Sequence, residues 1–344
     1  MKKHEKVTVI VFTDRAKAVG EEAARLLESG GYAPEVLDGR EVKISAEMER
    51  IFSDSRFIVF VSAVGIAIRL IAPFVRAKDR DPGIVAADEG KNFVISLLSG
   101  HLGGANELSE MLADGLGAVP VITTATDVNE KFAVDVWTKR AGCAIENTGA
   151  IRHISAAVLK DEKVGFYTEF ETEGELPAGL ERAGEGRTGI CVDFSGKCAP
   201  FDVTLNAVPK ILSVGAGCRK GTDPEKFERF FYHVLNEEGI SPSAVESISS
   251  IDLKKDEECM TGLAEKLGVP FITYSAEDLD GAGNTDSGGY EFDESDFVRR
   301  TTGTGNVCER SAFLSSGRGK ITVKKRSEGG MTLAVAIRDW KCRF

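Results

Sequence analysis

Short buried strands alternate with helical segments along most of this chain, and this alternation restricts the fold more than any other feature. Residues 7–12 form a continuous, mostly β-branched run, which is the pattern of a strand buried on both faces. A helical spacing of apolar residues follows over 16–27 and stops at Gly30 and Gly31, and residues 57–61 repeat the buried-strand pattern. Strands and helices in this order predict an α/β fold with largely parallel sheets.

The same pattern continues to the end of the chain. It predicts further strands at residues 84–87, 93–98, 119–123, 163–167, 189–192, 210–214, 248–251 and 270–274. It predicts helices at 103–116, 224–237, 257–267 and 307–314, and a hairpin of strands 321–325 and 331–337 joined by residues 326–330. Pro224, after Thr222 or Asp223 as the cap, marks the start of one of these helices.

The alternation of strands and helices is interrupted after residue 142, where short predicted strands flank an acidic, turn-rich stretch at 169–177. We therefore expect two three-layer α/β lobes with mainly parallel sheets, joined by a small middle module. The expected ranges are 1–141, 142–208 and 209–344. A Gly-, Ser- and Asp-rich stretch at 281–293 is expected to be a loop.

Charge and cysteine content exclude several classes of protein. The 344 residues carry a net charge of −11 at pH 7, which argues against nucleic-acid binding because phosphates require a basic face. No apolar run approaches the ~20 residues of a membrane span. The seven cysteines include no C-x-x-C pair, and the four histidines form no metal motif. We therefore expect neither a disulfide framework nor a metal site. We also expect a cytoplasmic protein, where cysteines stay reduced.

One glycine-rich turn, residues 99–107, combines several features that suit catalysis. It reads SGHLGGANE and lies between a predicted strand and a predicted helix. Its glycines allow close approach of a ligand to the backbone, and the start of the helix offers N–H groups to an anion. Histidine is the residue type that can exchange a proton near neutral pH, which makes His101 a candidate base, and Glu107 lies one turn into the helix. A tight turn with a surface histidine is the alternative interpretation.

Two other segments are expected at the same edge of the sheet if the strands are parallel. Residues 62–69, which include Gly65, follow the strand at 57–61, and residues 123–127 carry Thr124 and Asp127. Their polar groups suit ligand binding and helix capping equally well. Asp88 lies in a polar turn that also fits a solvated hairpin.

The last third of the chain contains three segments suited to carboxylates. Residues 213–222 place Arg219 and Lys220 beside glycines, but they match neither the dinucleotide fingerprint nor a P-loop. Residues 250–257 add Asp252 and Lys254, and residues 302–310 form a glycine loop before a short helix, with a turn and a cap as the alternative. No nucleophile elbow is present. These loops indicate a polyanionic small molecule as the ligand.

Several of these strings resemble one protein family. GIAIRLIAP at 65–73, SGHLGGANE at 99–107 and VITTATD at 121–127 are similar to the N-terminal domain of the cobalt-precorrin-5A hydrolase family, CbiG. GAGCRKGT at 215–222, IDLKKDE at 251–257 and GNVCER at 305–310 resemble its C-terminal domain, which also occurs alone in related cobalamin-pathway proteins. The stretch at 281–293 departs from the family pattern by its length.

The resemblance implies a step of anaerobic cobalamin biosynthesis. Such an enzyme opens the δ-lactone of cobalt-precorrin-5A and releases C20 with its methyl group as acetaldehyde, which leaves cobalt-precorrin-5B. The cobalt belongs to the substrate, so no cofactor is expected. The expected partners are the tetrapyrrole substrate and, transiently, other corrin-pathway enzymes, with neither nucleic acid nor membrane.

This chemistry leads to a hypothesis for the site. His101 is the general base, the N–H groups around Gly103 and Gly104 stabilise the oxyanion, and Glu107 or Asp88 orients the imidazole. Arg219, Lys220 and Lys254 hold propionates. The other expected substrate-binding residues are Ser99, Gly100, Asn106, Gly65, Thr124, Asp127, Gly217, Asp252 and Asn306. The rival hypotheses are a non-catalytic tetrapyrrole carrier and a sugar- or nucleotide-binding regulator.

Overall fold

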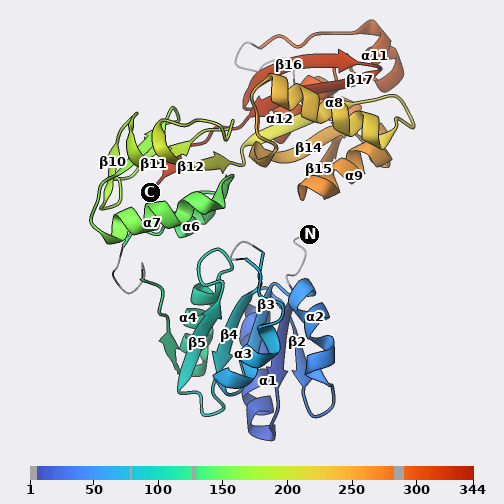
Figure 1. The fold of residues 1–344 in the computed structure, drawn as a ribbon. Coiled ribbons are helices and arrows are strands. Elements are labelled where there is room, and N and C mark those ends of the chain that lie inside the picture. The colour runs from blue at the N-terminus through green and yellow to red at the C-terminus, as the bar shows by residue number, and fades with distance from the viewer. Residues whose placement is uncertain (1–5, 78–79, 126–128, 130, 283–289) are drawn as a thin grey trace. The chain divides into compact units, whose positions relative to one another are not determined.

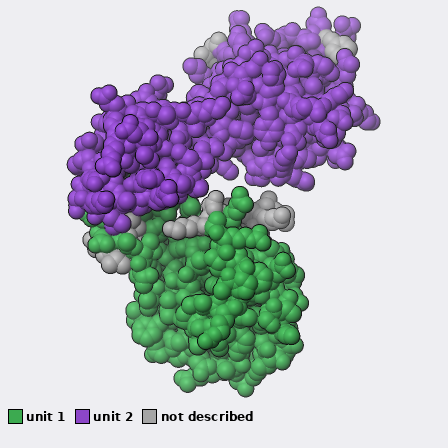
Figure 2. Space-filling view, viewed as in Figure 1, with its two compact units in different colours: residues 1–136 green, residues 137–344 purple. Residues whose placement is uncertain are grey.

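The structure, a computed structural model, describes residues 6–77, 80–125, 129, 131–282 and 290–344. The chain divides into two compact units, residues 1–136 and 137–344, which Figure 2 colours separately. The first unit contains one sheet, and the second contains two larger sheets and one two-stranded pair. The expected division into three ranges stays a prediction.

A six-stranded sheet in the order β2-β1-β3-β4-β5-β6 forms the centre of the first unit (Figure 1). Its strands are β1 (Lys6–Val11), β2 (Ala33–Asp38), β3 (Phe57–Val61), β4 (Gly83–Ala87), β5 (Phe93–Leu98) and β6 (Val119–Val121). Its helices are α1 (Asp14–Ser29), α2 (Ile44–Asp54), α3 (Val64–Ile71) and α4 (Ala105–Leu116), and α6 (Val134–Arg140) begins at the end of this unit.

Helices cover both faces of this sheet. Val9 of β1 packs in one core with α1 and α4, whereas the next residue, Ile10, packs in the other core with α2 and α3. This alternation follows from the period of two along a strand, and it requires an apolar residue at every position of a strand covered on both sides. The expected three-layer α/β architecture is confirmed for this lobe.

The direction of β5 differs from the expectation. β1 to β4 are parallel, but β5 is antiparallel to β4 and β6 is parallel to β5. Only residues 88–92 connect β4 to β5, whereas a parallel connection needs about a dozen residues or more. The expectation that residues 62–69 and 99–107 lie at the same edge is therefore wrong. Residues 62–69 are also not a loop, because α3 begins at Val64.

The second unit begins with a five-stranded sheet in the order β10-β8-β11-β12-β7. Its strands are β7 (Cys143–Ile145), β8 (Val164–Thr168), β10 (Leu180–Arg182), β11 (Gly186–Val192) and β12 (Phe201–Pro209), with the helix α7 (Ile151–Leu159). Nearby, β9 (Thr172–Glu173) pairs in parallel with β18 (Cys342–Arg343). Trp137 Nε1 donates to the Arg343 carbonyl and its ring stacks on Phe344, so the end of the chain packs against this region.

The second five-stranded sheet has the order β15-β14-β13-β17-β16. Its strands are β13 (Leu212–Gly217), β14 (Val245–Ile251), β15 (Phe271–Tyr274), β16 (Lys320–Glu328) and β17 (Met331–Ile337). The helices of this part are α8 (Pro224–Glu237), α9 (Glu258–Leu267), α10 (Ala276–Gly281), α11 (Asp296–Thr302) and α12 (Cys308–Ser315).

This sheet is also covered on both faces. Val214 of β13 packs in a core with Phe227 of α8 and Met260 of α9, while the opposite face receives α12. A Cβ on Gly215 would lie 1.7 Å from the Cys308 carbonyl oxygen, so glycine is required for this close approach. Two three-layer α/β lobes with mainly parallel sheets, as expected, are confirmed.

Some boundaries differ from the sequence expectation. The helix at 224–237 has the predicted bounds, and Asp223 rather than Thr222 caps it by accepting from the Lys226 backbone N–H. The connection of the last hairpin is shorter than expected, because Gly329 and Gly330 have φ of 57° and 85° and form a two-residue turn. Within the described residues, every helix is too short or too polar to cross a bilayer.

Candidate active site

The turn between β5 and α4 has a backbone that depends on its glycines. A Cβ on Gly103 would lie 2.2 Å from Ser99 Cβ, and Gly104 has a φ of 83°. Ser99 itself has a φ of 57°, and its Oγ is buried without a hydrogen-bond partner among the described residues. A Cβ on Gly100 would lie 2.5 Å from Asn106 Oδ1. Gly100 and Gly103 therefore allow tight packing, and Gly104 supplies a left-handed residue before α4.

His101 forms the most informative contact of this turn. Its Nδ1 lies 3.1 Å from Asp135 Oδ2, and the two side chains are only 11% and 12% exposed. Burial raises the pKa of Asp135, but the hydrogen bond and charge of His101 outweigh it, so the pKa falls below its usual value. Because an ionised carboxylate only accepts, the contact with Asp135 places a proton on Nδ1, and in the neutral form of the imidazole Nε2 is then the basic nitrogen. This arrangement orients a base.

The backbone N–H groups at the start of α4 are mostly used within the turn. The Gly104 N–H donates to the His101 carbonyl at 3.0 Å, and the Asn106 N–H donates to Gly100. The expectation that Gly104 binds an oxyanion is therefore wrong. The Gly103 N–H has no acceptor among the residues that the structure describes, which leaves it as the donor for a bound anion.

Asn106 and Thr124 hold the turn together. Asn106 is buried, its Oδ1 accepts from Ser96 Oγ at 2.7 Å, and its amide donates to Thr124 Oγ1 at 3.2 Å. These bonds tie the start of α4 to β5 and to the segment after β6, so they position the turn that carries His101. Asp127, the other residue expected here, lies outside the described residues.

Asp88 and Gly65 lie at the opposite edge of the sheet from His101, because β5 separates the turn at Asp88 from the turn at Ser99. Asp88 accepts from the backbone N–H groups of its own turn and from Asn92, and it cannot orient the imidazole. Gly65 lies in the first turn of α3, and its neighbour Ile66 lines a pocket of about 360 Å³ together with Arg69. Glu107 is exposed on α4, and the carboxylate at His101 Nδ1 is that of Asp135.

Arg219 and Lys220 line a basic pocket of about 830 Å³ in the second unit. Its charged residues are four cations and two carboxylates, namely Arg219, Lys220, Lys226, Arg229, Asp223 and Glu328. The Arg219 side chain crosses the β16–β17 turn, since a Cβ on Gly330 would lie 2.6 Å from its Nε. An excess of exposed cations around a cavity suits a ligand with several carboxylates.

Other expected binding residues have structural roles. Lys254 Nζ lies 2.8 Å from Glu257 Oε1, so it is not a free clamp for a propionate. Asn306 is 1% exposed; its amide donates to Glu309 and its Oδ1 accepts from the Glu309 N–H. Its expected role in substrate binding is wrong, because a ligand cannot reach it. Gly217 allows β17 to approach, and Asp252 is exposed at the start of a short 3₁₀ turn.

Sequence reasoning missed Asp135. It lies 34 residues after His101 and outside every segment that was singled out, at the start of a short helix that was not predicted. Sequence spacing carries no signal for this contact, because the fold alone brings the two residues together.

Comparisons with known proteins match three consecutive segments between residues 46 and 336. Residues 46–127 match the Cobalamin synthesis G N-terminal family, residues 132–209 match the Cobalamin biosynthesis central region, and residues 212–336 match the Cobalamin synthesis G C-terminus. The turn with His101 lies in the first of these segments, and the basic pocket lies largely in the last.

Individual relatives match over most of their length. A cobalt-precorrin-5A hydrolase of Salmonella typhimurium is 35% identical, over 83% of both proteins. A protein of the same name from Priestia megaterium is 32% identical, over 83% of this chain and 80% of its own. A crystal structure of a cobalamin biosynthesis protein G homolog from Sulfolobus solfataricus covers 97% of each chain at 23% identity, with a TM-score of 0.44. The matched family segments and the two hydrolases at 32% and 35% identity show that the chain belongs to the cobalt-precorrin-5A hydrolase family.

Proposed function

We propose that this chain is a cobalt-precorrin-5A hydrolase, which opens the δ-lactone of its substrate and releases acetaldehyde to leave cobalt-precorrin-5B. The relatives that carry this name match more than four-fifths of the chain. The observation that carries the proposal is the His101–Asp135 pair, a base oriented by a carboxylate, with His101 in the segment that matches the N-terminal family and Asp135 in the segment that matches the central region.

The first step is attack of water on the lactone carbonyl. His101 Nε2 takes a proton from the water, and Asp135 stabilises the imidazolium that results. The tetrahedral oxyanion accepts a hydrogen bond from the Gly103 N–H. Its collapse breaks the lactone carbon–oxygen bond and leaves an alkoxide on C20 and a carboxylic acid on the ring A acetate, which then loses its proton to solvent.

The second step releases the two-carbon fragment. The C20 alkoxide collapses to the carbonyl of acetaldehyde, and the bond between C20 and the macrocycle breaks. The electron pair of that bond stays on the macrocycle and its cobalt, which are the substrate's own electron sink. The protonated His101 gives the proton that it took from water to the macrocycle, which holds this electron pair, and the imidazole returns to its starting form.

The acetate and propionate groups of the substrate are the ligands that we assign to the basic pocket. Arg219 and Lys220 lie on its rim and are exposed, so each is free to bind a carboxylate. A cytoplasmic location and transient transfer of the labile tetrapyrrole between corrin-pathway enzymes also belong to this proposal.

The test is release of acetaldehyde from cobalt-precorrin-5A by the full chain. His101→Ala is expected to lower the rate by about 100-fold or more while substrate binding and the circular dichroism spectrum are retained. His153→Ala, which removes an exposed histidine of α7, is the matched control and keeps the wild-type rate. Acetaldehyde release near the wild-type rate by His101→Ala removes His101 from the mechanism.

The basic pocket also fits a non-catalytic carrier of tetrapyrrole intermediates, which needs cations but no base. Stoichiometry separates the two functions. An enzyme releases many equivalents of acetaldehyde per chain, whereas a carrier binds one equivalent of substrate and releases none.

A further inference from the structure

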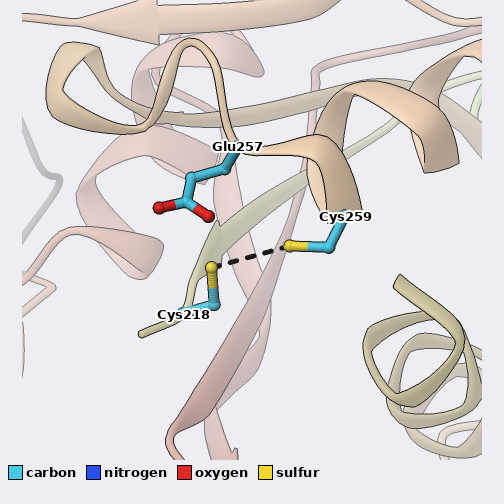
Figure 3. A group of neighbouring side chains, drawn as sticks. All are labelled: Cys218, Glu257 and Cys259. Atoms are coloured by element: carbon cyan, nitrogen blue, oxygen red, sulfur yellow. Dashed lines mark hydrogen bonds between the residues drawn. The ribbon is translucent and has the colours of Figure 1, made fainter. Parts of the chain in front are cut away.

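Two cysteines and a glutamate converge beside the loop that follows β13. Cys218 follows the end of β13, Cys259 lies in the first turn of α9, and Glu257 immediately precedes that helix. Figure 3 shows the two thiols pointing toward each other with the Glu257 carboxylate next to them. The Sγ atoms are 3.6 Å apart, and each ligand atom of the three residues lies within 4.8 Å of the others.

The spacing of the two sulfur atoms matches a shared metal ion. Zinc–thiolate bonds are about 2.3 Å long, so two thiolates on one tetrahedral ion lie ~3.8 Å apart. The observed 3.6 Å is close to this value, and it is far above the ~2.0 Å of a disulfide bond. The side chains therefore need little movement to bind one ion together.

The carboxylate is held in place by its own partners. Glu257 Oε1 accepts from Lys254 Nζ at 2.8 Å, and Oε2 accepts from the Gly221 N–H at 3.1 Å. An ionised carboxylate offers about four lone pairs, so these two bonds leave capacity for a metal ion. Such outer contacts orient the ligand, as the partners of metal ligands commonly do.

Charge at the cluster also favours a divalent ion. Two thiolates and one carboxylate carry three negative charges, and a divalent ion leaves one, which the ammonium group of Lys254 offsets. Cys259 is 2% exposed, whereas Cys218 and Glu257 are only half-buried, so the cluster can be reached from one side. A buried set of ligands with one accessible side leaves a fourth position for water.

We propose that Cys218, Glu257 and Cys259 bind one thiophilic divalent ion of the zinc class. Thiolates prefer such ions over magnesium or calcium. The site is separate from the substrate's cobalt and does not depend on the proposed reaction. It departs from the expectation of no metal site, which rested on local motifs; Cys218 and Cys259 are 41 residues apart and leave no such motif.

The experiment titrates the reduced, metal-free full chain with Cd²⁺ and follows the thiolate-to-cadmium charge-transfer absorption, with Zn²⁺ as the competitor. We expect one equivalent to bind and Zn²⁺ to displace it. Cys218→Ser is expected to weaken binding by at least ~100-fold and to remove most of the band, because losing a direct ligand costs more than losing an outer-shell partner. Glu257→Gln keeps an oxygen that can coordinate the ion but loses the charge, so it is expected to weaken binding by only ~10-fold and to keep the thiolate band.

Cys143→Ser is the matched control, since Cys143 is also half-buried but lies outside the cluster, and it keeps wild-type binding. Cys259 is buried in α9, so Cys259→Ser is a less suitable variant because it can fail to fold. Cys218 lies outside helix and strand, and Cys218→Ser therefore tests the site independently of folding. A missing charge-transfer band in the wild type, or an unchanged band in Cys218→Ser, would overturn the proposal. So would a loss of two titratable thiols before metal is added, because that would show that the pair closes as a disulfide.

Discussion

His101 depends on a carboxylate that only the fold brings to it. Asp135→Asn replaces an acceptor by an amide that can donate to Nδ1, which moves the imidazole proton to Nε2 and removes the lone pair that takes the proton from water. We expect kcat for acetaldehyde release to fall by about 100-fold while KM changes little. Steady-state kinetics of the purified full chain measures both.

The control for this variant is Glu110→Gln, which neutralises an exposed carboxylate on α4 and keeps the wild-type rate. A wild-type kcat in Asp135→Asn would show that the contact with His101 is structural only. A low kcat that is shared by Glu110→Gln would instead point to the net charge of the surface.

Single residues were predictable where their chemistry is rare in the chain. His101 stood out as one of four histidines, and Arg219 with Lys220 as adjacent cations in a glycine loop. Asn306 and Lys254 were misread because sequence does not distinguish an exposed polar group from one whose partners are inside the protein. Both bind a neighbouring glutamate three residues away, a distance at which a capping or ion-pair role is an equally good interpretation.

The β4–β5 hairpin depends on the carboxylate of Asp88. Burial raises the pKa of Asp88, but bonds from the Phe93 N–H and from Asn92 outweigh it, so its pKa lies below the usual 3.8. The carboxylate of Asp88 therefore binds a proton more readily in the unfolded chain than in the folded chain. The stability that the carboxylate gives is full above pH 3.8 and is lost as the pH falls through the lower folded value.

Asp88→Ala is accordingly expected to destabilise the hairpin by about 1 kcal/mol at neutral pH, and the difference from the wild type shrinks below pH 3.8. Hydrogen exchange of the Asn92 and Phe93 amides measures it locally. Asp114→Ala, which removes an exposed carboxylate at the end of α4, is the control and shows no such pH dependence. A constant difference at all pH values would mean that the turn does not depend on the ionised form.

The contact of β13 with α12 gives a prediction about packing. A Cβ on Gly215 would meet backbone atoms, the Cys308 carbonyl oxygen at 1.7 Å and the Ala312 nitrogen at 2.7 Å, which cannot move without shifting the helix. Gly215→Ala is expected to cost at least ~3 kcal/mol and to lower the melting temperature or abolish folding. Gly262→Ala in α9, where nothing lies within 4 Å, is expected to raise it slightly. Equal melting temperatures would contradict the close approach.

Whole elements were predictable where local signals agree. The helix α8 has an apolar face, a capping Asp223 and Pro224 in its first turn, and its bounds were predicted correctly. β2 was missed because it is a half-exposed edge strand that contains a proline, and β12 because polar residues interrupt its apolar run. The short link between β4 and β5 is a signal of antiparallel pairing, and the hairpin interpretation of the Asp88 turn agrees with it; the shared edge expected for residues 62–69 and 99–107 depended instead on parallel strands.

At the scale of the whole molecule, the basic pocket gives a prediction about substrate binding. His101 and Asp135 belong to the first unit, and the basic pocket belongs to the second. If the pocket binds carboxylates that do not react, it stabilises the bound substrate and the transition state equally. Loss of such uniform binding raises KM and leaves kcat unchanged.

The double variant Arg219→Ala/Lys220→Ala is therefore expected to raise KM by about 10- to 30-fold, since each exposed charge-assisted contact contributes about 1 kcal/mol, and to leave kcat near the wild-type value. Raising the salt concentration is expected to raise the wild-type KM and to affect the variant less, because screening acts on the same charges. Lys320→Ala, at the other end of β16 from the pocket, is the control and keeps both constants. A fall in kcat at constant KM would place these cations at the reacting centre. Unchanged kcat and KM would show that the basic pocket does not bind the substrate, and the test of His101 would still stand.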